Sequence, residues 1–259
     1  MEDLDLTQRI AVAQARFDLL RNETALPPGP FPQLIPSLTA APGVHLGYAV
    51  SPRGRAIGVV ATGSGAAMTD SVSRILTDLT DDRTARMFRT LAALQGHDNL
   101  RMEVVLGEPS HIRAGVRGFD DVRARVVLDE EGFPVSERNR LLGRGGVVGM
   151  DVVSDGRQPS TLATIAEADA EGAGLVGARR VLESRYAGEP DLRTVRRTGL
   201  VDRSLIDWLV EHGADGSGSP GRLGAVHSLL ETAGPDEMGW TAGAIRRSAV
   251  FYYRSPLPR

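Results

Sequence analysis

Apolar residues recur at every third or fourth position in three stretches of the chain, which is the spacing of one face of an α-helix. The first stretch predicts an amphipathic helix over residues 4–20, and the second predicts a helix over residues 68–79. The third stretch ends near Leu94, and either Asp81 or Asp82 is suited to cap the N-terminus of its helix.

A proline-rich segment follows the first helix. LPPGPFPQLIP, residues 26–36, carries prolines that remove backbone donors and fix φ, so we expect no regular structure there. GVHLGYAV and AIGVVAT, residues 43–50 and 56–62, come next and are separated by SPRGR, whose Pro and Gly fit a turn. This order predicts a β-hairpin directly after the proline-rich segment.

The rest of the chain mixes predicted strands with predicted helices. Residues 161–172 and 221–234 read as helices, whereas residues 175–210 fit a strand or a helix, because periodicity does not separate the two in short apolar runs. Alternating or continuous apolar positions predict strands at residues 99–107, 111–118, 121–132, 144–156 and 249–254.

The order of these elements favours a single α+β domain over residues 1–259. Strands come in pairs joined by short turns, which implies antiparallel pairing, and helices stand between the pairs rather than after each strand as in a parallel sheet. We see neither a linker composition nor a short internal repeat that divides the chain.

Composition narrows the chemistry. All 30 basic side chains are arginine and cysteine is absent, which excludes Schiff-base lysines, P-loop lysines, disulfides and thiolate sites. The histidines lack metal-ligand spacing, and GSGSPG, residues 216–221, lacks the strand that a dinucleotide site needs, so we expect neither a metal nor a cofactor. A net charge of −3, no signal-peptide pattern and no long apolar run predict a cytoplasmic protein without nucleic-acid or membrane partners.

Arginines alternate with apolar residues in two of the predicted strands. In VRARVVL, Arg123 and Arg125 share one face, opposite an apolar face. In HIRAGVRG, Arg113 and Arg117 share a face in the same way. The arginines either are solvated on half-buried strands or line a concave surface that binds a phosphate or carboxylate.

The last predicted strand carries two adjacent tyrosines in a chain that has four. Alternation places Tyr252 on one face with Val250, and Tyr253 on the other face with Phe251. One tyrosine therefore packs towards helices while the other faces whatever the sheet encloses. Strand propensity alone accounts for such a pair, and so does a ring that lines a ligand cavity.

Four stretches together resemble the ABBA, or PT-barrel, peptide prenyltransferases of the cyanobactin type. PPGPFPQLIPSL followed by VHLGYAVSPRGRAIGVV resembles the proline-containing lead into the family's first barrel strands. DDVRARVVLDEEGFP resembles its basic barrel strand, and RRTGL resembles a shorter element further on. GRLGAVHSLLETAGPDEMGWTAGAIRRSAVFYYRS resembles its closing helix, Trp-bearing segment and Tyr-rich strand. The resemblance implies an antiparallel β-barrel surrounded by helices, with a ligand channel through the barrel.

The resemblance also implies roles for particular residues. In this family basic side chains bind an isoprenoid diphosphate, tyrosines shield the allyl cation, and a cyclic peptide enters the mouth of the barrel. Arg123 matches a diphosphate-binding position, and Tyr252 or Tyr253 matches the tyrosines of the closing strand. The family's first barrel strand supplies an acidic base, but VHLGYAV has Gly47 there, and AIGVVAT lacks the basic diphosphate contact of the second strand.

These departures favour a PT-barrel-like protein that binds a peptide and is not an enzyme. We predict an accessory protein for ribosomally made, modified peptides, with a precursor peptide and tailoring enzymes as partners. One alternative is an active prenyltransferase whose base lies elsewhere, for example at Glu103, and another is an unrelated α+β interaction module. Catalytic residues stay unassigned, and the residues predicted to contact peptide or anion are Tyr48, Arg113, Arg123, Arg125, Trp240, Tyr252 and Tyr253.

Overall fold

The structure is a computed structural model, and it describes the chain in separate ranges. These are residues 4–22, 24, 26–51, 55–107, 110–130, 134–142, 149–154, 161–169, 178–185, 191–197, 237–242 and 247–254. Within these ranges, side chains are described up to residue 154, except at positions 137, 140 and 141, and again from residue 250 to 253.

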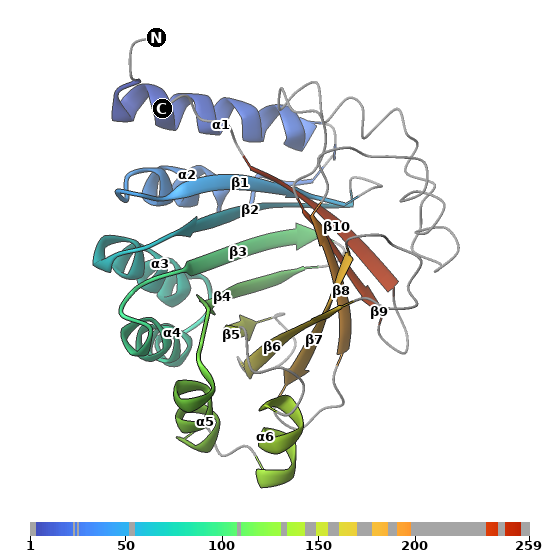
Figure 1. The fold of residues 1–259 in the computed structure, drawn as a ribbon. Helices are drawn as coiled ribbons and strands as arrows, with labels where there is room; N and C mark the ends of the chain where they lie inside the picture. Colours follow the sequence, from blue (N-terminus) through green and yellow to red (C-terminus); the bar gives the residue numbers. More distant parts are fainter. Residues whose placement is uncertain are drawn as a thin grey trace.

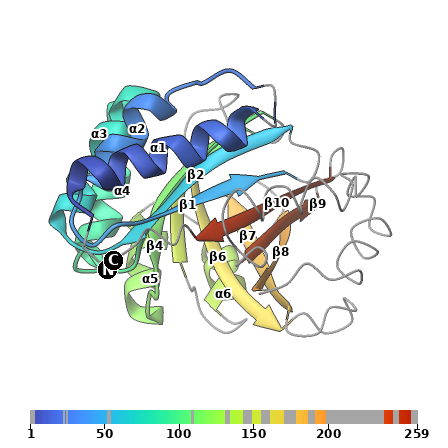
Figure 2. The ribbon, with the colours of Figure 1, turned by 90° about the horizontal axis from the view of Figure 1, so that it is seen from above.

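Ten antiparallel strands form a closed barrel (Figures 1 and 2). Consecutive strands are neighbours from β1 to β10, and β10 pairs with β1 to close the ring. The α+β barrel predicted from the sequence is therefore confirmed. The strands are β1 (His45–Val50), β2 (Ala56–Gly63), β3 (Leu100–Gly107), β4 (His111–Arg117), β5 (Gly149–Ser154), β6 (Thr161–Asp169), β7 (Ala178–Arg185), β8 (Asp191–Arg197), β9 (Glu237–Ala242) and β10 (Arg247–Arg254).

Helices cover the outer face of the first five strands (Figures 1 and 2). α2 contacts β1 and β2, α3 contacts β3, and α4 contacts β4 and β5, while α1 packs on α2. No helix among the described residues is long and apolar enough to cross a membrane. The cytoplasmic location stays a prediction. The helices are α1 (Leu6–Asn22), α2 (Phe31–Thr39), α3 (Ala66–Leu79), α4 (Asp82–Leu94), α5 (Asp121–Glu130) and α6 (Val135–Leu142).

Strand alternation divides the buried side chains into two clusters. The larger cluster joins the outward faces of the strands to the helices, and it includes Phe251 and Tyr253 of β10. The smaller cluster lies inside the barrel and includes Val60, Val105 and Tyr252. Because neighbouring residues of a strand point to opposite faces, the two adjacent tyrosines belong to different clusters, as the alternation predicts.

Two contacts explain how the helices are held in place. The Tyr48 hydroxyl donates to the Ala13 carbonyl at 2.9 Å and so ties β1 to α1. Asp81 caps α4, because its carboxylate accepts from the backbone N–H of Thr84 at 2.7 Å. This backbone hydrogen bond lowers the pKa of Asp81 below its ordinary value. The predicted cap is confirmed.

The prediction of an irregular segment at residues 26–36 is wrong in part, because α2 begins at Phe31. Pro32 lies in the first turn, where its missing N–H has no helical partner to lose, and Pro36 removes a single hydrogen bond. The buried residues Phe31, Leu34, Ile35 and Leu38 give this short helix an apolar face against the barrel.

The prediction of a strand at residues 121–132 is also wrong. The segment forms α5, whose buried residues Ala124, Val127 and Leu128 have helical spacing. The Asp120 carboxylate accepts from the Arg123 backbone N–H at 2.8 Å, which is the hydrogen bond of an N-cap.

The prediction of a helix at residues 161–172 is wrong as well. Residues 161–169 form β6, which is paired on both sides, with β5 and with β7. Pairing with two neighbours outweighs the helix propensity of its alanines and its glutamate. The ambiguous segment 175–210 contains β7 and β8, and the helix predicted at 221–234 lies outside the described residues.

Candidate functional site

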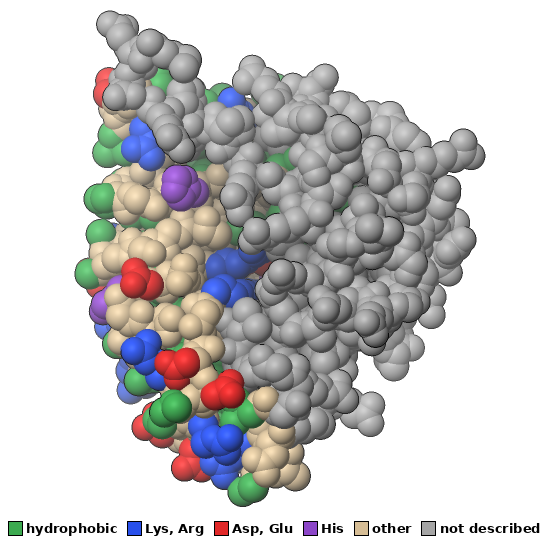
Figure 3. Space-filling model, in the orientation of Figure 1, with side chains coloured by type: hydrophobic (Ala, Val, Ile, Leu, Met, Phe, Trp, Pro, Cys, Tyr) green, Lys and Arg blue, Asp and Glu red, His purple; other side chains and the backbone are tan. Residues whose placement is uncertain are grey.

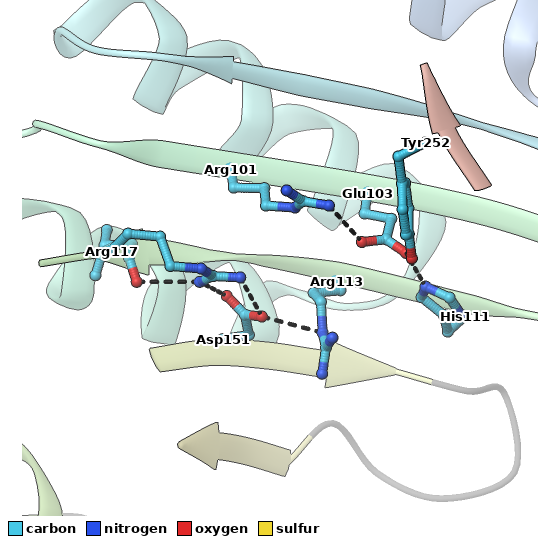
Figure 4. Close-up of polar contacts among 8 residues, drawn as sticks. Arg101, Glu103, His111, Arg113, Arg117, Asp151 and Tyr252 are labelled. Carbon is cyan, nitrogen blue, oxygen red and sulfur yellow. Dashed lines mark hydrogen bonds and ion pairs between the residues drawn. The ribbon is translucent and has the colours of Figure 1, made fainter. Parts of the chain in front are cut away.

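Polar side chains gather on the inward face of β3, β4, β5 and β10 (Figure 4). Two carboxylates, Glu103 and Asp151, are fully buried there. A buried carboxylate needs hydrogen bonds and opposite charge to stay ionised, and neighbouring side chains of the barrel supply both. We call this group the interior polar cluster: Arg101, Glu103, His111, Arg113, Arg117, Asp151 and Tyr252.

Glu103 is held from three strands. The Tyr252 hydroxyl donates to Oε1 at 2.6 Å, and His111 Nε2 lies 2.6 Å from the same oxygen. Arg101 Nη2 lies 3.5 Å from Oε2, and its guanidinium sits over the Tyr252 ring, 5.2 Å from the centroid. A carboxylate and a tyrosine therefore face the barrel interior together, with a cation over the ring.

Asp151 is clamped by two arginines of β4. Arg117 binds it in the bidentate manner, with Nη1–Oδ1 at 2.5 Å and Nη2–Oδ2 at 3.0 Å, and Arg113 Nε lies 3.0 Å from Oδ2. Gly115 faces Asp151 across the two strands, and a Cβ there would lie 2.2 Å from Oδ1. The glycine thus leaves the space that the carboxylate occupies.

The charges of this cluster nearly balance. Three arginines face two carboxylates, so the cluster carries a net charge of about +1 before any contribution from His111. The arginines of such a cluster can donate hydrogen bonds to a bound anion, and the carboxylates of the cluster can accept a proton. Among the described residues no group of three or more metal-ligating side chains gathers. The absence of a metal or cofactor stays a prediction.

Two of the residues predicted from the sequence, Arg113 and Tyr252, lie in the interior polar cluster. Tyr48 and Tyr253 do not, since both belong to the outward cluster and pair with each other across β1 and β10. Burial raises the pKa of Tyr253 far above its ordinary value. The backbone of Trp240 pairs with Ala249, and the Trp240 side chain lies outside the described part of the chain.

Arg123 and Arg125 are exposed on α5, so the strand geometry that directed them into the barrel is wrong. Arg123 forms an i,i+3 ion pair with Asp120 at 3.5 Å. Figure 3 shows acidic and basic side chains intermingled on the face that carries α5 and α6. Arg123 therefore lies beside an opposite charge, and the anion binding predicted for the two arginines stays a prediction.

Sequence reasoning did not assign Arg101, His111 or Asp151 to the site, and it named Glu103 only as an alternative base. The available signal was alternation, because Arg101 and Glu103 alternate with the apolar residues of NLRMEVVLG and so share the face opposite to them. β1 and β2, which lie between β10 and β3 in the ring, carry no carboxylate, and their inward residues include Ala49 and Val60.

The closed antiparallel barrel with helices outside defines the PT-barrel, or ABBA, fold. No protein-family model matches the chain, and no curated protein matches it. Solved structures of aromatic prenyltransferases do match it over almost their whole length.

Three of these structures illustrate the likeness. 6-Dimethylallyltryptophan synthase from Micromonospora olivasterospora, in complex with DMASPP and Trp, is 13% identical, with 99% of both chains covered and a TM-score of 0.66. The prenyltransferase PriB, in a ternary complex with L-tryptophan and dimethylallyl thiolodiphosphate, is 12% identical, with 96% of both chains covered and a TM-score of 0.66. NotF in complex with brevianamide F and DMSPP is 10% identical, with 98% of this chain and 96% of that chain covered and a TM-score of 0.61. The cyanobactin type stays a prediction.

Proposed function

We propose that the chain is an aromatic prenyltransferase that binds an isoprenoid diphosphate and an electron-rich aromatic acceptor inside the barrel. The observation that carries this proposal is the buried Glu103 carboxylate, hydrogen-bonded to Tyr252, in a barrel interior that also holds three arginines. It replaces the prediction of a protein without enzymatic activity as the leading proposal. That prediction rested on the lack of a carboxylate on β1 and of a basic diphosphate contact on β2, whereas β3 and β4 carry both kinds of group.

The proposed reaction assigns one task to each part of the interior polar cluster. The C–O bond of the allylic diphosphate breaks, and the diphosphate leaves with the electron pair towards the arginines. The aromatic carbon of the acceptor forms the new C–C bond to the allyl cation. The proton on that carbon then passes to the Glu103 carboxylate, which restores the aromatic ring. The Tyr252 ring offers its π-face to the cation, as it does to the Arg101 guanidinium.

The arginines of the cluster are already paired, and this affects the diphosphate. Arg113 and Arg117 would have to divide their N–H donors between Asp151 and the incoming phosphates. Each charge-assisted hydrogen bond to phosphate contributes roughly 1.5–3 kcal/mol. We therefore propose that the donor binds at the Arg101 side of the cluster, beside Glu103 and Tyr252, where it also lies nearest to the base.

The ligands of the similar structures guide the choice of acceptor. Two of these structures are complexes with tryptophan, and one is a complex with brevianamide F. We propose free tryptophan or a tryptophan-containing peptide as the acceptor class. The test is incubation with dimethylallyl diphosphate and each acceptor, with mass spectrometry to detect the addition of one dimethylallyl group.

Two variants sharpen the test. Glu103→Gln keeps the side-chain shape and removes the base, and we expect turnover to fall about 10²–10⁴-fold. Glu130→Gln changes an exposed glutamate on α5 and serves as the matched control, which we expect to be fully active. Absence of product from the wild-type protein with every acceptor contradicts the proposal.

The second candidate is the peptide-presenting accessory protein predicted from the sequence. The observation that favours it is the inward face of β1 and β2, where Gly47, Ala49, Gly58 and Val60 alternate without a charge. Its partners would be a precursor peptide and tailoring enzymes. Saturable binding of a precursor peptide by calorimetry, without any prenylated product, would favour this candidate over the enzyme.

A further inference from the structure

His111 connects the buried Glu103 carboxylate to the surface of the molecule. The Glu103 side chain is 0% exposed, whereas the His111 side chain is 18% exposed. Their contact, Nε2–Oε1, is 2.6 Å long. Because an ionised carboxylate only accepts hydrogen bonds, Nε2 carries the hydrogen in this contact.

Two donors share one oxygen of the Glu103 carboxylate. Oε1 accepts from His111 and from the Tyr252 hydroxyl, each at 2.6 Å (Figure 4). An sp² oxygen has two lone pairs, and these two donors occupy both of them. Oε1 is thereby fixed by donors from β4 and β10, and Oε2 lies on the side of Arg101.

We propose that His111 is a positioning residue that sets the pH range in which Glu103 works as a base. This inference rests on the proposed prenyl transfer. Neutral His111 donates to Oε1 and holds the carboxylate in one orientation. Protonated His111 forms an ion pair with the same carboxylate, and the added positive charge makes Glu103 a weaker proton acceptor.

Among the residues that the structure describes, the charged and titratable groups that face His111 come from β3, β4 and β10. Glu103 and Arg101 face it from β3, Tyr252 faces it from β10, and Arg113 follows it on β4 with its partner Asp151. Guanidinium and phenol groups keep one protonation state between about pH 5 and 8, whereas an imidazole changes charge in this range. We therefore expect the rate of prenyl transfer to fall on the acidic side.

The experiment measures kcat of prenyl transfer against pH, from about pH 5 to 9, for the wild type, His111→Asn and His111→Ala. Asparagine keeps a donor near Oε1 but does not titrate. We expect His111→Asn to stay within about tenfold of the wild type at pH 8 and to lose the acid-side fall. We expect His111→Ala to lose about 10–100-fold at pH 8, as is typical when a residue that orients a functional group is removed.

His97→Asn is the matched control. His97 bonds to Thr69 at 3.0 Å, outside the barrel, and its φ of 61° is one that asparagine tolerates. Its pH profile should match that of the wild type. If His111→Asn keeps the wild-type acid limb, Glu103 itself titrates and the inference is overturned, while the proposed function stands. If the wild-type protein forms no product, the proposed function and the inference about His111 are both contradicted. Circular dichroism of each variant checks folding, and the Asn variant decides the question if the Ala variant does not fold.

Discussion

Asp151→Asn is expected to destabilise the protein strongly, because Asp151 is the shared partner of two arginines inside the barrel. The Asp151 side chain is 0% exposed and that of Arg113 is 4% exposed, whereas that of Arg117 is 27% exposed and reaches water. Removing one member of a buried ion pair costs about 3–5 kcal/mol. Because Arg117 is partly hydrated, we expect the lower end of the range, about 3 kcal/mol.

The free energy of unfolding is measured from urea curves followed by circular dichroism and by tryptophan fluorescence. In a protein of this size, about 3 kcal/mol corresponds to a fall in Tm of roughly 6–12 °C. Asp18→Asn is the control, since Asp18 and Arg21 form a partly exposed pair at 3.6 Å on α1. Exposed pairs contribute about 0–1 kcal/mol, and salt screens them.

A small effect would refute the reasoning. If Asp151→Asn costs less than about 1 kcal/mol, or no more than Asp18→Asn, then Asp151 is hydrated in solution and the clamp is not a buried ion pair. The same variant also tests the charge balance of the interior polar cluster. Loss of one negative charge should strengthen the binding of dimethylallyl diphosphate, measured by calorimetry at low salt.

Three further predictions concern stability. Asp81→Ala removes the cap of α4 and should cost about 1 kcal/mol of unfolding free energy at pH 7. Because the pKa of Asp81 is lowered in the folded state, the cap stabilises the protein fully above the ordinary pKa of 3.8. The difference between variant and wild type in urea unfolding should therefore disappear as the pH falls through the folded-state pKa. Burial raises the pKa of Tyr253, so the stability of the wild type should decline once the pH exceeds the ordinary tyrosine pKa of 10.0. Phenolate absorbance should show that the wild type has one phenol that ionises only on unfolding and that Tyr253→Phe lacks it. Gly115→Ala would place a Cβ 2.0 Å from the Met150 carbonyl oxygen, so its Tm should fall by the equivalent of about 1–3 kcal/mol or more; an unchanged Tm would contradict the close approach of β4 and β5.

Local pattern predicts the elements whose periodicity is long or strict. Alternation in SAVFYYRS predicts that the two tyrosines face opposite sides of the sheet, and helical spacing with a capping aspartate predicts α4. α5 is not predicted correctly, because its run of apolar residues is short enough to fit either the strand period or the helix period. The signal that decides it lies outside the run, at Asp120, whose side chain caps the helix.

The site is less predictable than the fold because its parts are distant in the sequence. Alternation indicates that Glu103 faces away from Met102 and Val104, but nothing local indicates what it meets. Its hydrogen bond to Tyr252 spans 149 residues and depends on the closure of the barrel. Asp151 meets Arg117 across the pairing of β4 and β5, a register that strand patterns alone do not determine.

The pairing of β1 with β10 makes barrel closure the last event that folding can complete. Roughly 200 residues separate the two strands, and contacts of such long sequence separation form slowly because loop closure costs entropy. Until β10 docks, β1 and β9 are open edges that can pair with another chain. Tyr252 arrives with the same strand, so Glu103 gains its partner only when those edges disappear. A chain that has not closed its barrel is therefore at once prone to aggregate and without a complete site.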